Sequence, residues 1–122
     1  MILVKIMEKL NRSGYLKKLQ VFVYGSLQEG EENHNLISEY NPIIEKDYIK
    51  GVKKDTGLGF PAVFEGDNWV QGEVLKFLKD DASEVIKILD RLEAVPMLYT
   101  REKTTTKNGL EVFYYKGTES LK

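Results

Sequence analysis

The feature that most constrains the fold is an Asn-Gly turn near the end of the chain, with strand-forming residues on both sides. Residues 99–106 and 110–116 are rich in threonine, tyrosine, valine and phenylalanine, and they flank Lys107, Asn108 and Gly109. Asn-Gly readily supplies the positive φ angles that a tight hairpin needs. The sequence therefore predicts that these two segments pair as an antiparallel β-hairpin.

Further strands are predicted upstream, each bounded by glycine or polar residues. Residues 20–24 form a β-branched and aromatic run that ends at Gly25 and Ser26, which is typical of a buried strand that enters a tight turn. Asn33 is a candidate cap for a short helix after this turn. The other predicted strands are residues 48–49, 51–52, 61–64 and 69–77.

One helix is predicted between these strands and the final hairpin. It begins near residues 81–84, where an acidic or hydroxyl cap is followed by a first-turn glutamate. It ends by Ala94, because Pro96 disfavours helical backbone at Val95. Many short strands with one or two helices indicate an α+β domain, and a small closed barrel is one form it can take.

A carboxylate falls on the apolar face of this helix. At about 100° per residue, Val85, Leu89 and Leu92 share one face, and Glu93 falls about 80° from Val85, on the apolar side. Glu93 also lies in the last turn, at the negative end of the helix dipole. Burial and the dipole both raise the pKa of a carboxyl group, which suits general acid/base chemistry near pH 7.

Two other arrangements of Glu93 are compatible with the sequence. In the first, the helix ends before Leu92, and Glu93 lies in a solvated loop. In the second, Glu93 pairs with Arg101. Both arrangements would give Glu93 a structural role in place of a catalytic one.

Length and composition exclude several classes of function. The chain has 122 residues, about one domain, and we assign residues 20–122 to that domain and residues 1–19 to an N-terminal extension without an assigned element. Without cysteine, the chain has no disulfide framework, thiolate metal site or cysteine nucleophile. The net charge of −1 favours neither nucleic acid nor an anionic membrane. No apolar run approaches a membrane span, so we expect a cytoplasmic protein.

Several familiar functional motifs are incomplete in this chain. Residues 25–30 have the glycine spacing of a P-loop, but Glu31 and Glu32 stand where lysine and a hydroxyl residue must hold phosphate and magnesium. The single histidine, His34, has no ligand partner at helical spacing, so no metal site and no cofactor are expected. A triad of Ser26, His34 and an aspartate is compatible with residue order, but Ser26 lacks the G-x-S-x-G elbow.

A set of motifs in a fixed order points to one family. The turn Tyr24-Gly25-Ser26-Leu27 is followed by Gly30 and Asn33-His34, and residues 59–62 and 72–74 form two further motifs. Leu89-Asp90-Arg91-Leu92-Glu93 then precedes Tyr99-Thr100-Arg101. Together these motifs resemble the gamma-glutamylcyclotransferase and AIG2-like superfamily, over about residues 20–117.

The resemblance implies a fold and a reaction. The fold would be a small mixed β-barrel with flanking helices. Glu93 would be the catalytic acid/base, and the turn Tyr24-Gly25-Ser26-Leu27 would line the substrate site. The enzyme would cyclise a small gamma-glutamyl amide or amine to 5-oxoproline and release the amine, without a cofactor.

Two positions depart from the family pattern. Gln28-Glu29 stands where a basic residue is common, which leaves the leaving-group specificity open, and Ala94 stands where glycine is common. Two functions other than catalysis also remain open: a non-catalytic small-molecule binding domain and a partner-binding scaffold on the same fold. Candidates for hydroxyl contacts with a substrate are Tyr24, Tyr99 and one of Tyr114 or Tyr115, with strand packing as the alternative.

Overall fold

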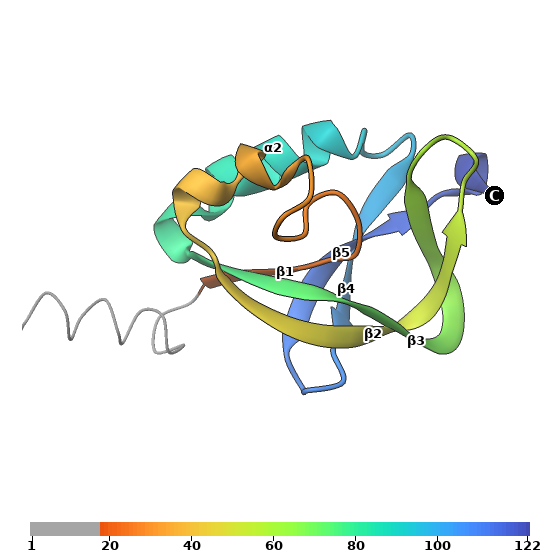
Figure 1. Ribbon diagram of the computed structural model, residues 1–122, viewed down its shortest axis with the longest axis horizontal. Helices are drawn as coiled ribbons and strands as arrows, with labels where there is room; N and C mark the ends of the chain where they lie inside the picture. The colour runs from red at the N-terminus through yellow and green to blue at the C-terminus, as the bar shows by residue number, and fades with distance from the viewer. Residues whose placement is uncertain (1–17) are drawn as a thin grey trace, which may run out of the picture.

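The computed structural model describes residues 18–122, which form one curled, mixed β-sheet covered on one side by a helix (Figure 1). The strands are β1 (Lys18–Val23), β2 (Ile43–Asp55), β3 (Pro61–Leu78), β4 (Tyr99–Thr105) and β5 (Glu111–Gly117), in the sheet order β2-β3-β1-β5-β4. Strand β1 is antiparallel to β3 and parallel to β5. The described residues thus confirm an α+β fold built on a small mixed half-barrel.

The predicted hairpin is confirmed. Strands β4 and β5 pair in antiparallel register from Tyr99 opposite Gly117 to Thr105 opposite Glu111. Gly109 has a φ of 87°, the left-handed backbone that favours glycine. The Thr106 amide donates to the Leu110 carbonyl at 2.8 Å, which closes the turn.

Strand β3 differs from its sequence prediction. We expected two strands, at residues 61–64 and 69–77, and the structure has one strand of 18 residues. The register of β2 against β3 shifts between Gly51 and Val52, so that residues 65–67 of β3 are accommodated as an irregularity. Gly66 fits there because a Cβ atom would lie 2.3 Å from a Val52 methyl group. The polar residues inside this bulged strand interrupt its apolar pattern, so the sequence does not show that the strand is continuous.

Hydrogen bonds, one of them to a buried carboxylate, join the tip of the hairpin to β2. The Lys107 amide donates to the Tyr48 carbonyl at 2.9 Å, and the Asn108 amide donates to Asp47 Oδ1 at 3.2 Å. Asp47 is fully buried and also accepts a hydrogen bond from the Tyr48 amide at 2.8 Å. Because β2 is one edge of the sheet and the hairpin is the other, these bonds curl the sheet toward a barrel.

The helix α2 (Ala82–Leu92) lies across one side of the curled sheet, and the loop after β1 runs beneath it (Figure 1). Val85 and Leu89 are fully buried against the sheet, as the periodicity predicts. Asp81 occupies the N-cap position, but its side chain makes no capping hydrogen bond. Short 3-10 turns complete the described part: η1 (His34–Leu36), η2 (Ser38–Tyr40), η3 (Lys79–Asp81) and η4 (Glu119–Leu121).

The predicted N-terminal extension, residues 1–19, lies outside the described residues except for Lys18 and Leu19. Both of these residues belong to β1. Within residues 18–122, no helix is long and apolar enough to cross a membrane.

Candidate active site

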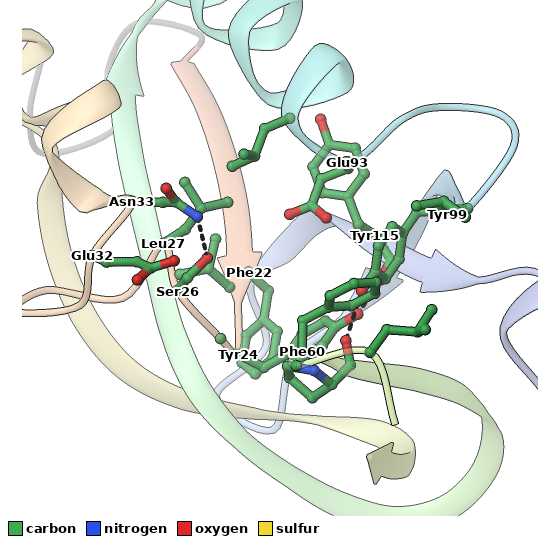
Figure 2. A pocket seen from close by; sticks show the side chains of 17 residues that line it. Phe22, Tyr24, Ser26, Leu27, Glu32, Asn33, Phe60, Glu93, Tyr99 and Tyr115 are labelled. Atoms are coloured by element: carbon green, nitrogen blue, oxygen red, sulfur yellow. Dashed lines mark hydrogen bonds between the residues drawn. The ribbon is translucent and has the colours of Figure 1, made fainter. Parts of the chain in front are cut away.

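A cavity of about 350 Å³ opens where the end of β1, the loop before β3, the end of α2 and the start of β4 meet. This volume is in the range of small-molecule sites. The five site residues predicted from the sequence all line this cavity: Glu93, Tyr24, Gly25, Ser26 and Leu27. Figure 2 shows Glu93 on one side of the space, with Ser26 and Leu27 facing it from the other. Their functional roles stay predictions.

Hydrogen bonds to its carbonyl groups fix the conformation of the turn after β1. The Gly25 carbonyl accepts from the Gln28 amide at 3.1 Å, and the Ser26 carbonyl accepts from the Asn33 amide at 2.9 Å. The Leu27 carbonyl lies 2.8 Å from Nδ1 of His34. Within residues 18–122, the amides of Gly25, Ser26 and Leu27 donate no hydrogen bond. These three amides therefore belong to residues that line the cavity and have no acceptor in that part of the chain, which makes them candidate donors to an anionic group.

Asn33 and His34 both form hydrogen bonds with the turn after β1. Asn33 precedes η1 as expected, but its side chain does not cap that turn. Its Nδ2 donates to Ser26 Oγ at 2.7 Å (Figure 2). Because the Ser26 hydroxyl is bonded to Asn33 and His34 Nδ1 is bonded to the Leu27 carbonyl, the Ser26–His34 triad is not formed.

The cavity tyrosines are fixed by hydrogen bonds to the protein. The Tyr24 hydroxyl donates to the Tyr115 carbonyl at 2.5 Å and accepts from the Val63 amide at 3.3 Å. The Tyr99 hydroxyl donates to the Pro61 carbonyl at 2.7 Å. Burial is the main cause that raises the pKa of Tyr24, Tyr99 and Tyr115 above the ordinary tyrosine value. These three side chains are neutral, and their hydroxyl groups already donate their protons to acceptors of the protein.

The end of α2 places Glu93 at the cavity. Glu93 is the C-cap residue, and the chain then turns through Ala94, whose φ of 48° is left-handed. The Ala94 amide donates to the Arg91 carbonyl at 3.2 Å, and the Val95 amide donates to the Asp90 carbonyl at 3.1 Å. This pair of bonds is a Schellman motif, which ends the helix in a defined geometry. The helix thus extends through Leu92, and Glu93 is not a solvated loop residue.

The predicted alternative in which Glu93 pairs with Arg101 is also wrong. Arg101 Nη1 lies 2.5 Å from Oδ2 of Asp90, one turn earlier on α2. Within residues 18–122, the Glu93 carboxyl group has no hydrogen-bond or ion-pair partner. Burial raises its pKa from 4.5 to about 7, and the helix C-terminus acts in the same direction. The site therefore holds a carboxyl group that exchanges protons near neutral pH.

Replacing Ala94 by glycine is expected to raise the free energy of unfolding by about 1 kcal/mol. A residue with a Cβ costs about 1 to 2 kcal/mol in the left-handed region, and the greater freedom of unfolded glycine offsets part of this gain. Urea unfolding of the two proteins measures the difference. A lower free energy of unfolding in the Ala94→Gly protein would contradict the strained turn.

Sequence reasoning missed part of the cavity wall. Glu32, Leu58, Phe60 and Leu98 also line it. The sequence singles out Glu32 only as a residue that is incompatible with a P-loop. The exposed Leu58 lies in the loop between β2 and β3. The described residues contain no group of three or more histidine, cysteine, aspartate or glutamate side chains arranged to hold a metal ion.

The family model for gamma-glutamyl cyclotransferase, AIG2-like, matches residues 21–121. A putative gamma-glutamylcyclotransferase of Vibrio cholerae is 34% identical over 103 residues, which are 83% of this chain and 85% of the relative. The gamma-L-glutamyl-butirosin B gamma-glutamyl cyclotransferase of Niallia circulans is 37% identical over 73 residues, 60% of this chain. Those residues span 44% of the Niallia protein.

Solved structures share the fold at low sequence identity. An AIG2-like protein from Mus musculus superposes with a TM-score of 0.64 at 17% identity, over 84% of this chain and 79% of the mouse chain. An uncharacterized protein from Pyrococcus horikoshii gives a TM-score of 0.58 at 19% identity, over 81% and 77% of the two chains. With the sequence matches and the shared fold together, the chain belongs to the AIG2-like gamma-glutamyl cyclotransferase family.

Proposed function

We propose that the protein is a gamma-glutamylcyclotransferase that converts a gamma-glutamyl amide or amine to 5-oxoproline and free amine, with Glu93 as general acid/base. The observation that carries this proposal is the Glu93 carboxyl group, which has a pKa raised to about 7 and no partner within residues 18–122. It shares its cavity with the free amides of the Gly25-Ser26-Leu27 turn. An acid/base and a set of oxyanion donors are the two parts that acyl transfer requires.

The substrate carries its own nucleophile. Glu93 accepts a proton from the substrate α-ammonium group, and the freed amine attacks the γ-carbonyl carbon to form the new C–N bond. A tetrahedral oxyanion results. As it collapses, the bond to the leaving nitrogen breaks, and Glu93 returns the proton to that nitrogen. The ring nitrogen, which kept two protons on attack, loses one of them to solvent as the lactam forms, so the products are 5-oxoproline and the free amine. Ring closure within one molecule has a high effective molarity, so holding the substrate folded supplies much of the rate.

Backbone amides are the proposed anion site. Within residues 18–122, no lysine or arginine lines the cavity, so side-chain cations there do not neutralise the substrate carboxylate or the oxyanion. The amides of Gly25, Ser26 and Leu27 are the donors in reach, and they are fixed before a substrate binds because the turn carbonyls are already bonded. Preorganised donors stabilise developing charge without a cost of reorganisation.

A panel of gamma-glutamyl compounds tests the proposal, with 5-oxoproline release as the readout. The panel contains gamma-glutamyl amines with neutral and cationic leaving groups, and gamma-glutamyl amino acids. Formation of 5-oxoproline together with one equivalent of the amine supports the proposal. Binding of these compounds without turnover would instead indicate a small-molecule binding domain.

Glu32 is expected to set part of the leaving-group preference. Its exposed carboxylate lines the cavity, where it attracts a cationic leaving group and repels one that carries a carboxylate. In the Glu32→Gln protein, the ratio of kcat/KM for cationic over carboxylated leaving groups is expected to fall about threefold to tenfold, because an exposed charge contributes about 1 kcal/mol. Glu31→Gln is the matched control, because Glu31 is exposed and does not line the cavity. An unchanged ratio in Glu32→Gln would contradict this assignment.

A further inference from the structure

Leu58 is an exposed apolar residue in the wall of the cavity. Within residues 18–122, four large hydrophobic side chains are exposed, and Leu58, at 63%, is the only one of them that lines the cavity. Single exposed leucines are common on protein surfaces, so exposure alone assigns no role. An exposed leucine in the wall of a ligand-sized cavity, by contrast, can pack against an apolar part of a ligand.

Hydrogen bonds fix the loop that carries Leu58. The amide and the hydroxyl group of Thr56 both donate to the Phe60 carbonyl, at 3.3 and 2.7 Å. Thr56 Oγ1 also accepts from the Leu58 amide at 3.2 Å. The Asp55 carboxylate accepts from the Gly57 amide at 2.8 Å. Leu58 is therefore positioned before a ligand binds, which reduces the entropy cost of a contact with it.

The cavity wall continues from Leu58 with further apolar side chains. Phe60, two residues later, lines the cavity, and its ring packs against the Tyr99 ring with 6.2 Å between the centroids. Leu98, which precedes Tyr99, also lines the cavity. Figure 2 shows Phe60 and Tyr99 on the side of the cavity away from Ser26. The cavity thus has an apolar side in addition to the polar side formed by the turn after β1.

The cavity offers no free cation or hydroxyl proton to a polar leaving group. The hydroxyl groups of Tyr24, Tyr99 and Tyr115 all donate to acceptors of the protein. Within residues 18–122, no lysine or arginine lines the cavity. A leaving group that carries a carboxylate would lose hydration on the apolar side without gaining a donor there. A hydrocarbon group has no such cost.

We infer that Leu58 is a specificity-determining residue, and that the substrates are gamma-glutamyl amides of aliphatic amines whose hydrocarbon chain packs against Leu58, Phe60 and Leu98. This inference rests on the proposed function, because it concerns the amine that the reaction releases. The glutamyl part of the substrate binds between Glu93 and the amides of the turn after β1, so the leaving amine extends toward the apolar side. Removal of its hydrocarbon chain from water favours binding in proportion to the apolar area buried.

The test measures kcat/KM for 5-oxoproline release from the gamma-glutamyl amides of propylamine, butylamine, pentylamine and hexylamine. These amines have nearly equal basicity and add no charge to the substrate, so only the apolar length changes, and the charge of Glu32 acts equally on all four. In the wild type, kcat/KM is expected to rise about twofold to fourfold for each added methylene group, since full burial of one corresponds to about fourfold. In Leu58→Ser, the rise over the whole series is expected to be about fivefold smaller.

Two further variants separate apolar contact from other effects of the substitution. Leu36→Ser is the matched control, because Leu36 is also exposed, at 40%, and does not line the cavity. It is expected to keep the wild-type dependence on chain length. Leu58→Met retains an apolar side chain of similar size and is expected to keep most of that dependence. Because the Leu58 side chain is exposed, both of its substitutions are expected to fold.

A second series of compounds needs no turnover. The N-alkyl glutaramates with the same four chains lack the α-amine, so they cannot cyclise, and calorimetry gives their Kd. In the wild type, binding is expected to tighten with chain length, and in Leu58→Ser it is expected to tighten less. A dependence of Kd on chain length without 5-oxoproline formation would reject only the proposed reaction.

Two results would overturn the role of Leu58. The first is that neither kcat/KM nor Kd improves with chain length in the wild type. The second is that Leu58→Ser and the wild type show the same dependence on chain length. Either result together with 5-oxoproline formation would reject only this inference and would leave the proposed reaction in place.

Discussion

Replacement of Glu93 by glutamine is expected to reduce kcat/KM for 5-oxoproline formation at pH 8 by about a thousandfold. Glutamine has nearly the same shape but accepts no proton in this pH range, and general acid/base catalysis contributes about 10²- to 10⁴-fold. The substrate α-amine would then lose its proton acceptor, and the leaving amine would lose its proton donor. Steady-state kinetics with the best substrate of the panel measure the loss.

A matched substitution on the same helix controls for the change in charge. Glu84 is exposed on the opposite face of α2, with Lys87 as its neighbour at 3.7 Å. Glu84→Gln makes the same chemical change outside the cavity and is expected to keep wild-type kinetics. Full turnover in Glu93→Gln would reject Glu93 as the acid/base, even if the reaction itself were confirmed.

The same substitution is expected to stabilise the protein above neutral pH. The raised pKa of Glu93 means that its ionisation opposes folding, so stability is lost as the pH rises from 4.5 to about 7. Glu93→Gln removes this effect, by up to about 3 kcal/mol above pH 7 and by nothing below pH 4.5. Urea unfolding at pH 4.5 and pH 8 measures both values. An equal difference at the two pH values would contradict a largely buried Glu93 carboxyl group that has no partner within residues 18–122.

Replacement of Gly72 by alanine is expected to reduce the free energy of unfolding by about 3 kcal/mol. A Cβ atom at this position in β3 would lie 2.3 Å from the Val23 carbonyl oxygen and 2.5 Å from the Phe22 ring. The first of these atoms belongs to the backbone of β1, so relief requires that the strand move, and overpacking of this kind costs about 1 to 3 kcal/mol or more. Urea unfolding measures the loss.

Gly109→Ala separates steric crowding from backbone strain. A Cβ atom at Gly109 would meet nothing within 4 Å, but the φ of 87° is unfavourable for alanine. The expected cost is about 1 kcal/mol, well below that of Gly72→Ala. A Gly72→Ala protein as stable as Gly109→Ala would show that β1 and β3 do not approach as closely as described.

Local sequence signals predicted the elements that depend on local chemistry. The Asn108-Gly109 turn specifies its hairpin because few other residues adopt its backbone angles. The periodicity of α2 placed Val85 and Leu89 in the core and turned Glu93 toward the cavity, since helix geometry relates these positions directly. The turn at residues 24–27 has no comparable periodic signal, so its place at the substrate site is predicted mainly by family resemblance.

Features that depend on contacts between distant segments were not predictable. Asp47 binds Asn108, which lies far along the chain, and nothing near Asp47 in the sequence indicates that partner. Arg101 of β4 pairs with Asp90 of α2, and this pairing depends on how the helix and the strand lie relative to each other in the folded chain. The Tyr24 and Tyr99 hydroxyl groups donate to carbonyl groups of distant segments, which the curl of the sheet brings close to them.

The most direct test of the proposed mechanism is the pH dependence of kcat/KM for 5-oxoproline formation by the wild-type protein. Glu93 must be ionised to accept the proton, so kcat/KM is expected to rise with pH through a midpoint near its pKa of about 7. The midpoint should be absent from the residual activity of Glu93→Gln. A wild-type midpoint near 4.5, or an identical midpoint in Glu93→Gln, would contradict the assignment of Glu93 as the catalytic acid/base.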